Sequence, residues 1–308
     1  MSSRRIISLG SVNLDVQVRA ERWPEASETL LARDFLMVGG GKAANVAYLA
    51  RLLQADVQLV AHVGDDVLAD FALQPLRDLG MDLQHVRHIP NTATAVAMIV
   101  GYPSAESTIV LANNANDVWT DDDHETVAAV IAAAPAESVL VTDFEIPARV
   151  VQRALEVAVR QGHRVIADPS PADRMPLEML PYVDYLTPNA GEATRLTGIK
   201  VDSLDTAFAA AQSLHKRGAG MVLVKLSDGG CVVWGAAIQE HVPSTGVQPV
   251  DTTGAGDAFA GALAVAILEK QPVSKAVRFA VAAADHAVTQ YGSQAAYPTR
   301  IELERRLI

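Results

Sequence analysis

Short runs of β-branched and apolar residues alternate along this chain with segments whose apolar residues repeat at helical spacing. The runs are RIISLG, VQLVAHVG, SVLVTDF, RVIADPS, DYLTPN and MVLVKLS. Between them, Val46, Leu49, Ala50 and Leu53 recur at i, i+3, i+4 and i+7, which predicts the buried face of a helix. Strands that alternate with helices favour a parallel sheet, because each crossover helix returns the chain to the same end of the sheet. We therefore predict an α/β fold with a doubly wound, mostly parallel sheet and helices on both faces.

Two regions interrupt this alternation. They are residues 12–38 and residues 92–112, and the second contains TATAVAMIVG and STIVLA. Both have strand patterns with no helical pattern directly after them. Antiparallel strands outside the main sheet would form a small β-sheet lid that closes over a substrate and excludes water. Turn-forming residues are spread evenly and mark no linker, so we expect residues 1–308 to form one domain with this lid inserted in the α/β core.

Composition limits the kinds of partner. A net charge of −11 argues against nucleic acid or an anionic membrane as the main partner. The longest apolar run, AFAGALAVAIL, is shorter than the roughly 20 residues that cross a bilayer, and the first residues lack a signal-peptide pattern. The single cysteine, Cys231, excludes an internal disulfide and is expected to be a buried thiol. We therefore expect a soluble, cytoplasmic protein.

The segment VDTTGAGDAFAGAL, residues 250–263, places glycines and an aspartate where a helix begins. Backbone N–H groups at a helix start lack internal partners, so such a point is suited to hold a phosphate group. A carboxylate beside a phosphate needs a separate task, and accepting the proton of an attacking hydroxyl is one. The candidate catalytic residues are Gly254, Ala255, Gly256 and Asp257. The alternative is a tight turn before a buried helix, and the missing Lys-Ser/Thr pair excludes a Walker A loop.

Two motifs near the N-terminus offer polar groups to a small ligand. In GSVNLD, residues 10–15, Asn13 and Asp15 follow the first strand at its carboxyl end, where open α/β sheets bind ligands. In GGGKAAN, residues 39–45, the glycines permit close approach to the backbone. The candidate contacts in this motif are Gly40, Gly41, Lys42 and Asn45. For Lys42, a solvent-exposed position at a helix start is an equal alternative.

Three segments place acidic residues at predicted helix starts. In TPNAGEA, residues 187–193, Asn189 and Glu192 are three apart and form a local capping pattern. Glu145, in TDFEIP, is either a ligand contact or a carboxylate favoured by the helix dipole. The run DDDHE, residues 121–125, also begins a helix, and we assign it a structural role.

These motifs occur in the order and at the spacing of the ribokinase-like (PfkB) family of carbohydrate kinases, which the chain resembles nearly from end to end. The resemblance implies ATP-dependent phosphorylation of a sugar hydroxyl, with ATP and Mg²⁺ as cofactors. The motifs are nearest to those of the family's ribokinases, so D-ribose, phosphorylated at its 5-hydroxyl, is the expected substrate. Fructose, a ketogluconate or a nucleoside such as pseudouridine is the alternative, because Ala43 stands where ribokinases commonly have glycine.

The resemblance also assigns residues to ligands. The implied sugar contacts are Asn13, Asp15, Gly40, Gly41, Lys42, Asn45, Glu145 and Asp257. The implied ATP contacts are Asn189, Lys225, Ser227, Gly230 and Gly256, of which Lys225 and Ser227 depart from the Thr-Leu-Gly that is common in ribokinases. Asn189 and Glu192 would organise Mg²⁺ through water. A monovalent-cation site, suited to K⁺, would be formed by Asp251, Thr253, Ala287, Gln290 and Gly292, without the serine that ribokinases often have near Ala296.

Two other functions remain possible interpretations, and the lid strands predict an oligomeric state. The G-x-G-x-x-A pattern of residues 39–44 fits a nucleotide-binding oxidoreductase, with Asp65 or Asp66 as the acidic residue about 20 positions on. A non-catalytic sugar sensor would keep Asp15 and Asn45 but would not need Asp257. Lid strands with unpaired edges tend to pair with another subunit, so we expect a homodimer formed through the lid.

Overall fold

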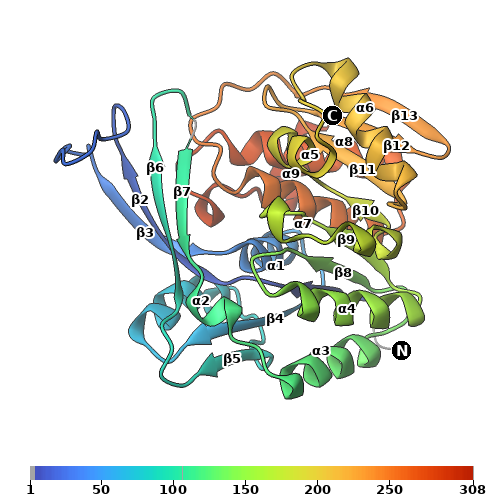
Figure 1. The fold of residues 1–308 in the computed structure, drawn as a ribbon, viewed down its shortest axis with the longest axis horizontal. Helices are drawn as coiled ribbons and strands as arrows, with labels where there is room; N and C mark the ends of the chain where they lie inside the picture. Colours follow the sequence, from blue (N-terminus) through green and yellow to red (C-terminus); the bar gives the residue numbers. More distant parts are fainter. Residues whose placement is uncertain (1–3, 106, 308) are drawn as a thin grey trace.

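The computed structural model describes residues 4–105 and 107–307. Its largest element is a nine-stranded sheet with the order β13-β12-β11-β10-β9-β8-β1-β4-β5 (Figure 1). The strands are β1 (Ile6–Leu9), β4 (Val57–Gly64), β5 (Val86–Ile89), β8 (Val139–Thr142), β9 (Arg164–Ala167), β10 (Tyr185–Leu186), β11 (Met221–Lys225), β12 (Cys231–Gly235) and β13 (Ile238–Val242). All neighbours from β5 to β11 pair in parallel, and β12 and β13 add an antiparallel edge.

Helices cover both faces of this sheet. They are α1 (Lys42–Leu52), α2 (Val67–Asp78), α3 (Asp121–Ala133), α4 (Ala148–Arg160), α5 (Ala190–Thr197), α6 (Leu204–Lys216), α7 (Ala255–Leu268), α8 (Val273–Ala287) and α9 (Arg300–Arg306). Side chains alternate along a strand, so Ile7 packs with α3, α4 and α6 in one core while Ile6 packs with α1, α7 and α8 in another. The predicted doubly wound α/β class is confirmed.

A second, four-stranded sheet has the order β3-β2-β6-β7 and stands beside the main sheet at the left of Figure 1. Its strands are β2 (Asn13–Arg19), β3 (Phe35–Gly40), β6 (Ala95–Gly101) and β7 (Ser107–Ala112), which we call the lid sheet. Within the predicted stretch 12–38, residues 20–34 form a loop without regular strands. Strand β3 ends at Gly40. The next residue, Gly41, has a φ of 91° and turns the chain into α1, and a Cβ there would lie 2.6 Å from Val12 Cα.

Local sequence explains several shorter features. Four 3₁₀ helices complete the regular structure described: η1 (Asn114–Asp117), η2 (Ala172–Arg174), η3 (Leu177–Tyr182) and η4 (Gln294–Ala296). The predicted strand DYLTPN is a regular strand only over β10, because Pro188 has no N–H and Asn189, which makes an isolated bridge with Lys225, caps α5. The acidic run 121–125 begins α3 behind a Thr120–Asp123 capping box, which confirms its structural role. Cys231 is buried, as expected, and none of the described helices is long and apolar enough to cross a membrane.

Candidate active site

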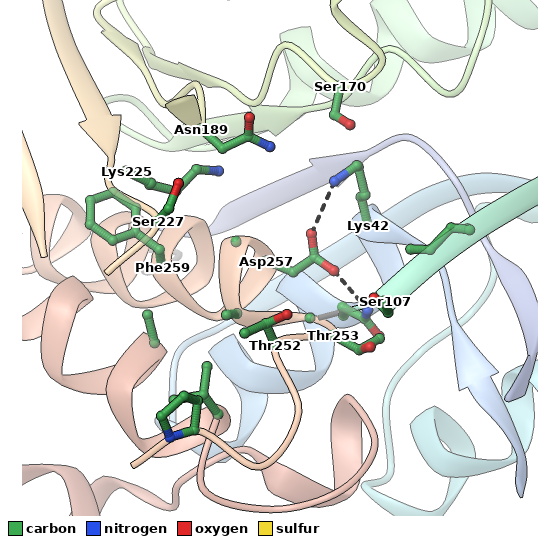
Figure 2. A pocket seen from close by; sticks show the side chains of 18 of the residues that line it. Lys42, Ser107, Ser170, Asn189, Lys225, Ser227, Thr252, Thr253, Asp257 and Phe259 are labelled. Atoms are coloured by element: carbon green, nitrogen blue, oxygen red, sulfur yellow. Dashed lines mark hydrogen bonds and ion pairs between the residues drawn. The ribbon is translucent and has the colours of Figure 1, made fainter. Parts of the chain in front are cut away.

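A cavity of about 760 Å³ lies under the lid sheet. It is lined by lid strands β2, β6 and β7, by the loops after β8 and β11, and by the starts of α1, α5 and α7 (Figure 2). Most of the predicted site residues line it: Asn13, Asp15, Gly41, Lys42, Asn45, Glu145, Asn189, Glu192, Lys225, Ser227, Gly230, Thr253, Gly254, Ala255, Gly256 and Asp257. Five others lie outside the lining: Gly40, Asp251, Ala287, Gln290 and Gly292.

The start of α7 is shaped by Gly254. This residue has a φ of 76°, in the left-handed region, and a Cβ there would lie 2.7 Å from the hydroxyl of Tyr297. The Tyr297 hydroxyl donates to the Gly254 carbonyl at 2.9 Å and so fixes the turn. No side chain caps this helix start in the described structure. Ala255 N donates to Thr252 O at 3.3 Å, and the N–H groups of Gly256 and Asp257 are left available to an anion.

Asp257 lies in this first turn and is held from two sides. The Asn45 amide donates to its Oδ2 at 2.8 Å, and the Lys42 ammonium lies 3.6 Å from its Oδ1 (Figure 2). Gln294 in turn donates to Asn45 Oδ1 at 3.0 Å, which orients the amide. Burial raises the pKa of Asp257 above its usual value, although Lys42 and then Asn45 act in the opposite direction. The carboxyl is therefore a stronger proton acceptor than an ordinary, exposed aspartate.

Lys42 is not a solvent-exposed lysine. Its side chain is 21% exposed, and its ammonium lies between Asp257 and Asp168, 3.8 Å from Asp168 Oδ1. Burial lowers the pKa of Lys42, but the Coulombic attraction of Asp168 and Asp257 outweighs burial and raises the pKa well above its usual value. The exposed alternative for Lys42 is thus wrong, and a charged lysine faces the cavity.

At one end of the cavity, carboxylates and amides gather beneath the lid. The Asn13 amide donates to Glu145 Oε2 at 3.1 Å and accepts from Asn116 at 2.8 Å. Glu145 therefore faces the cavity and does not cap α4, which begins at Ala148. Asp15 lies directly against Gly40, where any Cβ would collide with its carboxyl group. Burial, followed by repulsion from Glu145 and Asp257, raises the pKa of Asp15 well above its usual value.

The other end of the cavity is formed after β11 and at the start of α5. Asn189 and Glu192 make a reciprocal capping box: Glu192 N donates to Asn189 Oδ1 at 2.8 Å, and Asn189 N donates to Glu192 Oε2 at 2.7 Å. Lys225 ends β11, and the turn that follows contributes Ser227 and Gly230. The wall beyond is apolar and is formed by Val247, Pro249, Phe259, Val281 and Val288.

The predicted cation loop lies beside the cavity. Asp251 Oδ1 accepts from Thr253 N at 2.9 Å, and its Oδ2 accepts from Gln17 at 2.8 Å and from Gly292 N at 3.0 Å. The Thr253 hydroxyl is buried and has no hydrogen-bond partner among the described residues. Ala287 ends α8, and Gln290 precedes Gly292 in the next loop. Gln17 thus ties the lid sheet to this loop.

Two buried carboxylates of the site were not predicted. Asp143 follows β8 and accepts from Ser11 N at 3.1 Å and from Glu145 N at 2.9 Å. Asp168 follows β9 and accepts from the Lys225 ammonium at 2.8 Å. The usable signal was a carboxylate directly after an apolar strand, at the edge where such sheets bind ligands.

The G-x-G-x-x-A pattern does not lie where a dinucleotide fingerprint would. Gly39 belongs to β3 in the lid sheet, which is not a strand of the main sheet. Asp66 is occupied locally, because it caps α2 through Ala69 N at 3.1 Å and accepts from Thr94 N at 2.9 Å. Asp65 precedes this cap in the loop after β4. The structural context of an oxidoreductase site is therefore missing from this region.

Comparison with known proteins gives a consistent result. The pfkB family of carbohydrate kinases matches residues 3–300. The ribokinase of Haemophilus influenzae is 33% identical over 294 residues, which cover 96% of this chain and 95% of that protein. The deoxyribokinase of Salmonella typhi is 32% identical over 296 residues, with the same coverage. The structure of Arabidopsis thaliana ribokinase complexed with ribose and ATP superposes with a TM-score of 0.84 at 29% identity, over 99% of each chain.

Proposed function

The chain belongs to the pfkB family of carbohydrate kinases, and from this we propose that it transfers the γ-phosphoryl group of ATP to the 5-hydroxyl of D-ribose. The kinase activity follows from membership of this family of carbohydrate kinases. The choice of ribose is supported by the similarity to ribokinases and by the polar set beneath the lid, above all the buried Asp15 next to Asp257. We reject the oxidoreductase alternative, because the members of the matching family are carbohydrate kinases and the G-x-G-x-x-A pattern begins in the lid sheet.

In this reaction Asp257 accepts the proton of the sugar hydroxyl while that oxygen attacks the γ-phosphorus in line. A new oxygen–phosphorus bond forms, the bond to the β-phosphate oxygen breaks, and ADP leaves. The N–H groups of residues 254–257 hold the charge that develops on the transferring group. Because an alcohol is a far weaker acid than a carboxylic acid, proton transfer comes late, and the contacts of Asp257 with Asn45 and Lys42 serve to position it.

We further propose that the enzyme uses Mg²⁺ and K⁺. No cluster of three or more His, Cys, Asp or Glu side chains suited to a metal occurs in the described part of the chain, which fits an Mg²⁺ held by ATP phosphates, water and the Asn189–Glu192 edge. For K⁺, the unpartnered Thr253 hydroxyl beside the buried Asp251 carboxylate is a suitable oxygen pair. Dependence on ATP and a buried thiol at Cys231 support a cytoplasmic location.

The substrate assignment is tested by measuring ADP release with ribose, 2-deoxyribose, fructose, ketogluconates and nucleosides. We expect the highest kcat/KM with D-ribose. 2-Deoxyribose is the critical comparison, because a deoxyribokinase is among the relatives and the two sugars differ by one hydroxyl. A kcat/KM for ribose about a hundredfold below that for another sugar, which corresponds to roughly 2.7 kcal/mol, would overturn the ribose assignment and leave the kinase assignment intact.

The pH dependence of kcat/KM follows from the raised pKa of Asp257. Burial favours its protonated form, and only the ionised form accepts a proton, so activity is expected to fall with decreasing pH through a pKa above the usual aspartate value. Since Lys42 lowers the pKa of Asp257, Glu145 and Asp15, Lys42→Met should move this acid limb to still higher pH. An acid limb at the ordinary aspartate pKa, unmoved in Lys42→Met, would contradict this role for burial.

We also propose a homodimer formed through the lid sheet. Met37, Val16, Met98 and Val110 are register partners across its four strands, so their side chains form one row on the same face. The neighbouring row contains Asp15 and Ala97, which line the cavity, so the apolar row faces away from it. Met98 is 51% and Val110 50% exposed, and an apolar sheet face of this kind is typical of an interaction site.

Met98→Glu is expected to convert the dimer to a monomer, because it places a charge at the centre of the apolar row. Analytical ultracentrifugation over a range of concentrations should show a dissociation constant raised at least about 30-fold, as for a residue central to an interface. Val159→Glu is the matched control, since Val159 is 48% exposed on α4, outside the lid sheet. A wild-type protein that is monomeric at all concentrations, or equal effects of both variants, would refute the lid interface.

A further inference from the structure

Four charged side chains form a continuous series of contacts beside the cavity; Lys225, Lys42 and Asp257 line it, and Asp168 lies behind them. The Lys225 ammonium donates to Asp168 Oδ2 at 2.8 Å, while the Lys42 ammonium lies 3.8 Å from Asp168 Oδ1 and 3.6 Å from Asp257 Oδ1. These residues come from four elements: the end of β11, the loop after β9, the start of α1 and the first turn of α7. One buried carboxylate, Asp168, therefore lies between two lysines.

Both ammonium groups flank the start of α7. A Cβ on Gly256 would lie 3.1 Å from Lys225 Nζ and 4.0 Å from Asp168 Oδ2, so Lys225 reaches the first turn of the helix. Lys42 reaches the same turn through Asp257. Figure 2 shows Lys225 and Lys42 on opposite sides of Asp257. This turn is where the helix N–H groups would meet the phosphoryl group in transfer.

Asp168 has the properties of a group that fixes these lysines. It is 4% exposed, and the side chains of Lys225 and Lys42 are 15% and 21% exposed. Burial raises the pKa of Asp168, but Lys225 and then Lys42 outweigh burial, and the pKa lies below its usual value. A lysine ammonium has three donors on a flexible stem, so Lys225 keeps donors for a second partner while Asp168 restricts its position.

We propose that Asp168 is a positioning residue that holds Lys225 toward the phosphate chain of the nucleotide and Lys42 toward the reacting hydroxyl. Asp168 itself touches neither ligand. Charge moves toward the β-phosphate as the γ-phosphoryl group leaves, and an ammonium fixed there stabilises that charge. The proposal rests on the kinase function, but it is tested by nucleotide binding without any sugar.

The test is a double-mutant cycle of Lys225→Met and Asp168→Asn, measured by calorimetry with ADP and AMP. Lys225→Met should weaken ADP binding roughly 10- to 100-fold, as expected for a charge-assisted hydrogen bond, and change AMP binding much less, because AMP lacks the β-phosphate. Asp168→Asn should weaken ADP binding in the same direction. In the Lys225→Met background, Asp168→Asn should have little further effect, because its partner is already removed.

Two variants guard against a general loss of structure. Lys225→Arg should restore part of the ADP affinity, since it keeps a cation beside Asp168. Lys270→Met is the matched control, because Lys270 makes a similar 2.7 Å ion pair with Glu137 on the surface, and it should leave ADP binding unchanged. If Asp168→Asn fails to fold, Lys225→Met and Lys225→Arg still decide whether the ammonium binds the β-phosphate.

Three results would overturn the proposal. The first is unchanged ADP affinity in Lys225→Met, the second is an effect of Asp168→Asn that simply adds to that of Lys225→Met, and the third is a defect in Asp168→Asn that added Mg²⁺ reverses. The third would make Asp168 a metal-site residue. Absence of sugar phosphorylation with an intact ADP pattern would refute the proposed function and leave this inference standing.

Discussion

Asp257→Asn is expected to lower kcat about 1,000-fold, because the amide cannot accept the proton of the attacking hydroxyl. The asparagine side chain has the size of the aspartate, and its amide oxygen can still accept the hydrogen bond that Asn45 donates to Asp257 Oδ2 in the wild-type protein. Substrate KM should change little, so kcat and kcat/KM should fall together, as they do when an interaction made only in the transition state is lost. Steady-state kinetics with ribose and ATP measure both constants.

Two observations separate this loss from unfolding. The buried carboxylate of Asp257 has a raised pKa, which means that its ionised form is disfavoured in the folded protein, so the variant should unfold at a temperature no lower than the wild type. ADP should also bind with wild-type affinity, since the N–H groups of the first turn of α7 remain. Turnover within about tenfold of the wild type would remove Asp257 from the mechanism.

Asp15→Ala is expected to raise the sugar KM about 100-fold, because the sugar hydroxyls lose the buried carboxyl group that accepts their hydrogen bonds. Asp15 lies on β2, over the end of the cavity that we propose holds the sugar, and its carboxyl group lies against Gly40. ADP binding should be unaffected, because the nucleotide end is formed by other elements. Kinetics at varied ribose, combined with ADP calorimetry, separate the two ends. A variant with weakened ADP binding and an unchanged sugar KM would show that the sugar has been assigned to the wrong end.

The main sheet could be predicted because local sequence carries its signal. Each core strand is a short apolar run, and each crossover helix repeats its apolar residues at helical spacing, as Ala154 and Ala158 do on α4. Boundaries were less predictable, because tertiary pairing sets them. DYLTPN reads as six strand residues but forms a regular strand only over Tyr185–Leu186, and residues 20–34, which lie inside the stretch predicted as lid strand, form a loop between β2 and β3.

Parts of the site could be predicted where all their residues lie in one short motif. They could not be predicted where the fold brings residues from distant segments together. The Asn189–Glu192 capping box lies within four residues and could be read directly. Asp168 becomes part of the site through Lys225, 57 positions away, and sequence spacing does not show that β9 and β11 flank β10. The raised pKa of Asp257 likewise arises from burial in the assembled fold. No local sequence pattern around Asp257 indicates this shift.

We propose that this cavity binds ATP and ribose and transfers a phosphoryl group to the 5-hydroxyl of the sugar. The most direct measurement is phosphorus and carbon NMR of the product formed from ATP and ¹³C-labelled ribose. We expect ribose 5-phosphate in equal amount to ADP, with carbon–phosphorus coupling at C5 and C4 of the sugar, and none with Asp257→Asn over the same time. Phosphate on another hydroxyl, or ADP formed with inorganic phosphate and unmodified ribose, would contradict the account.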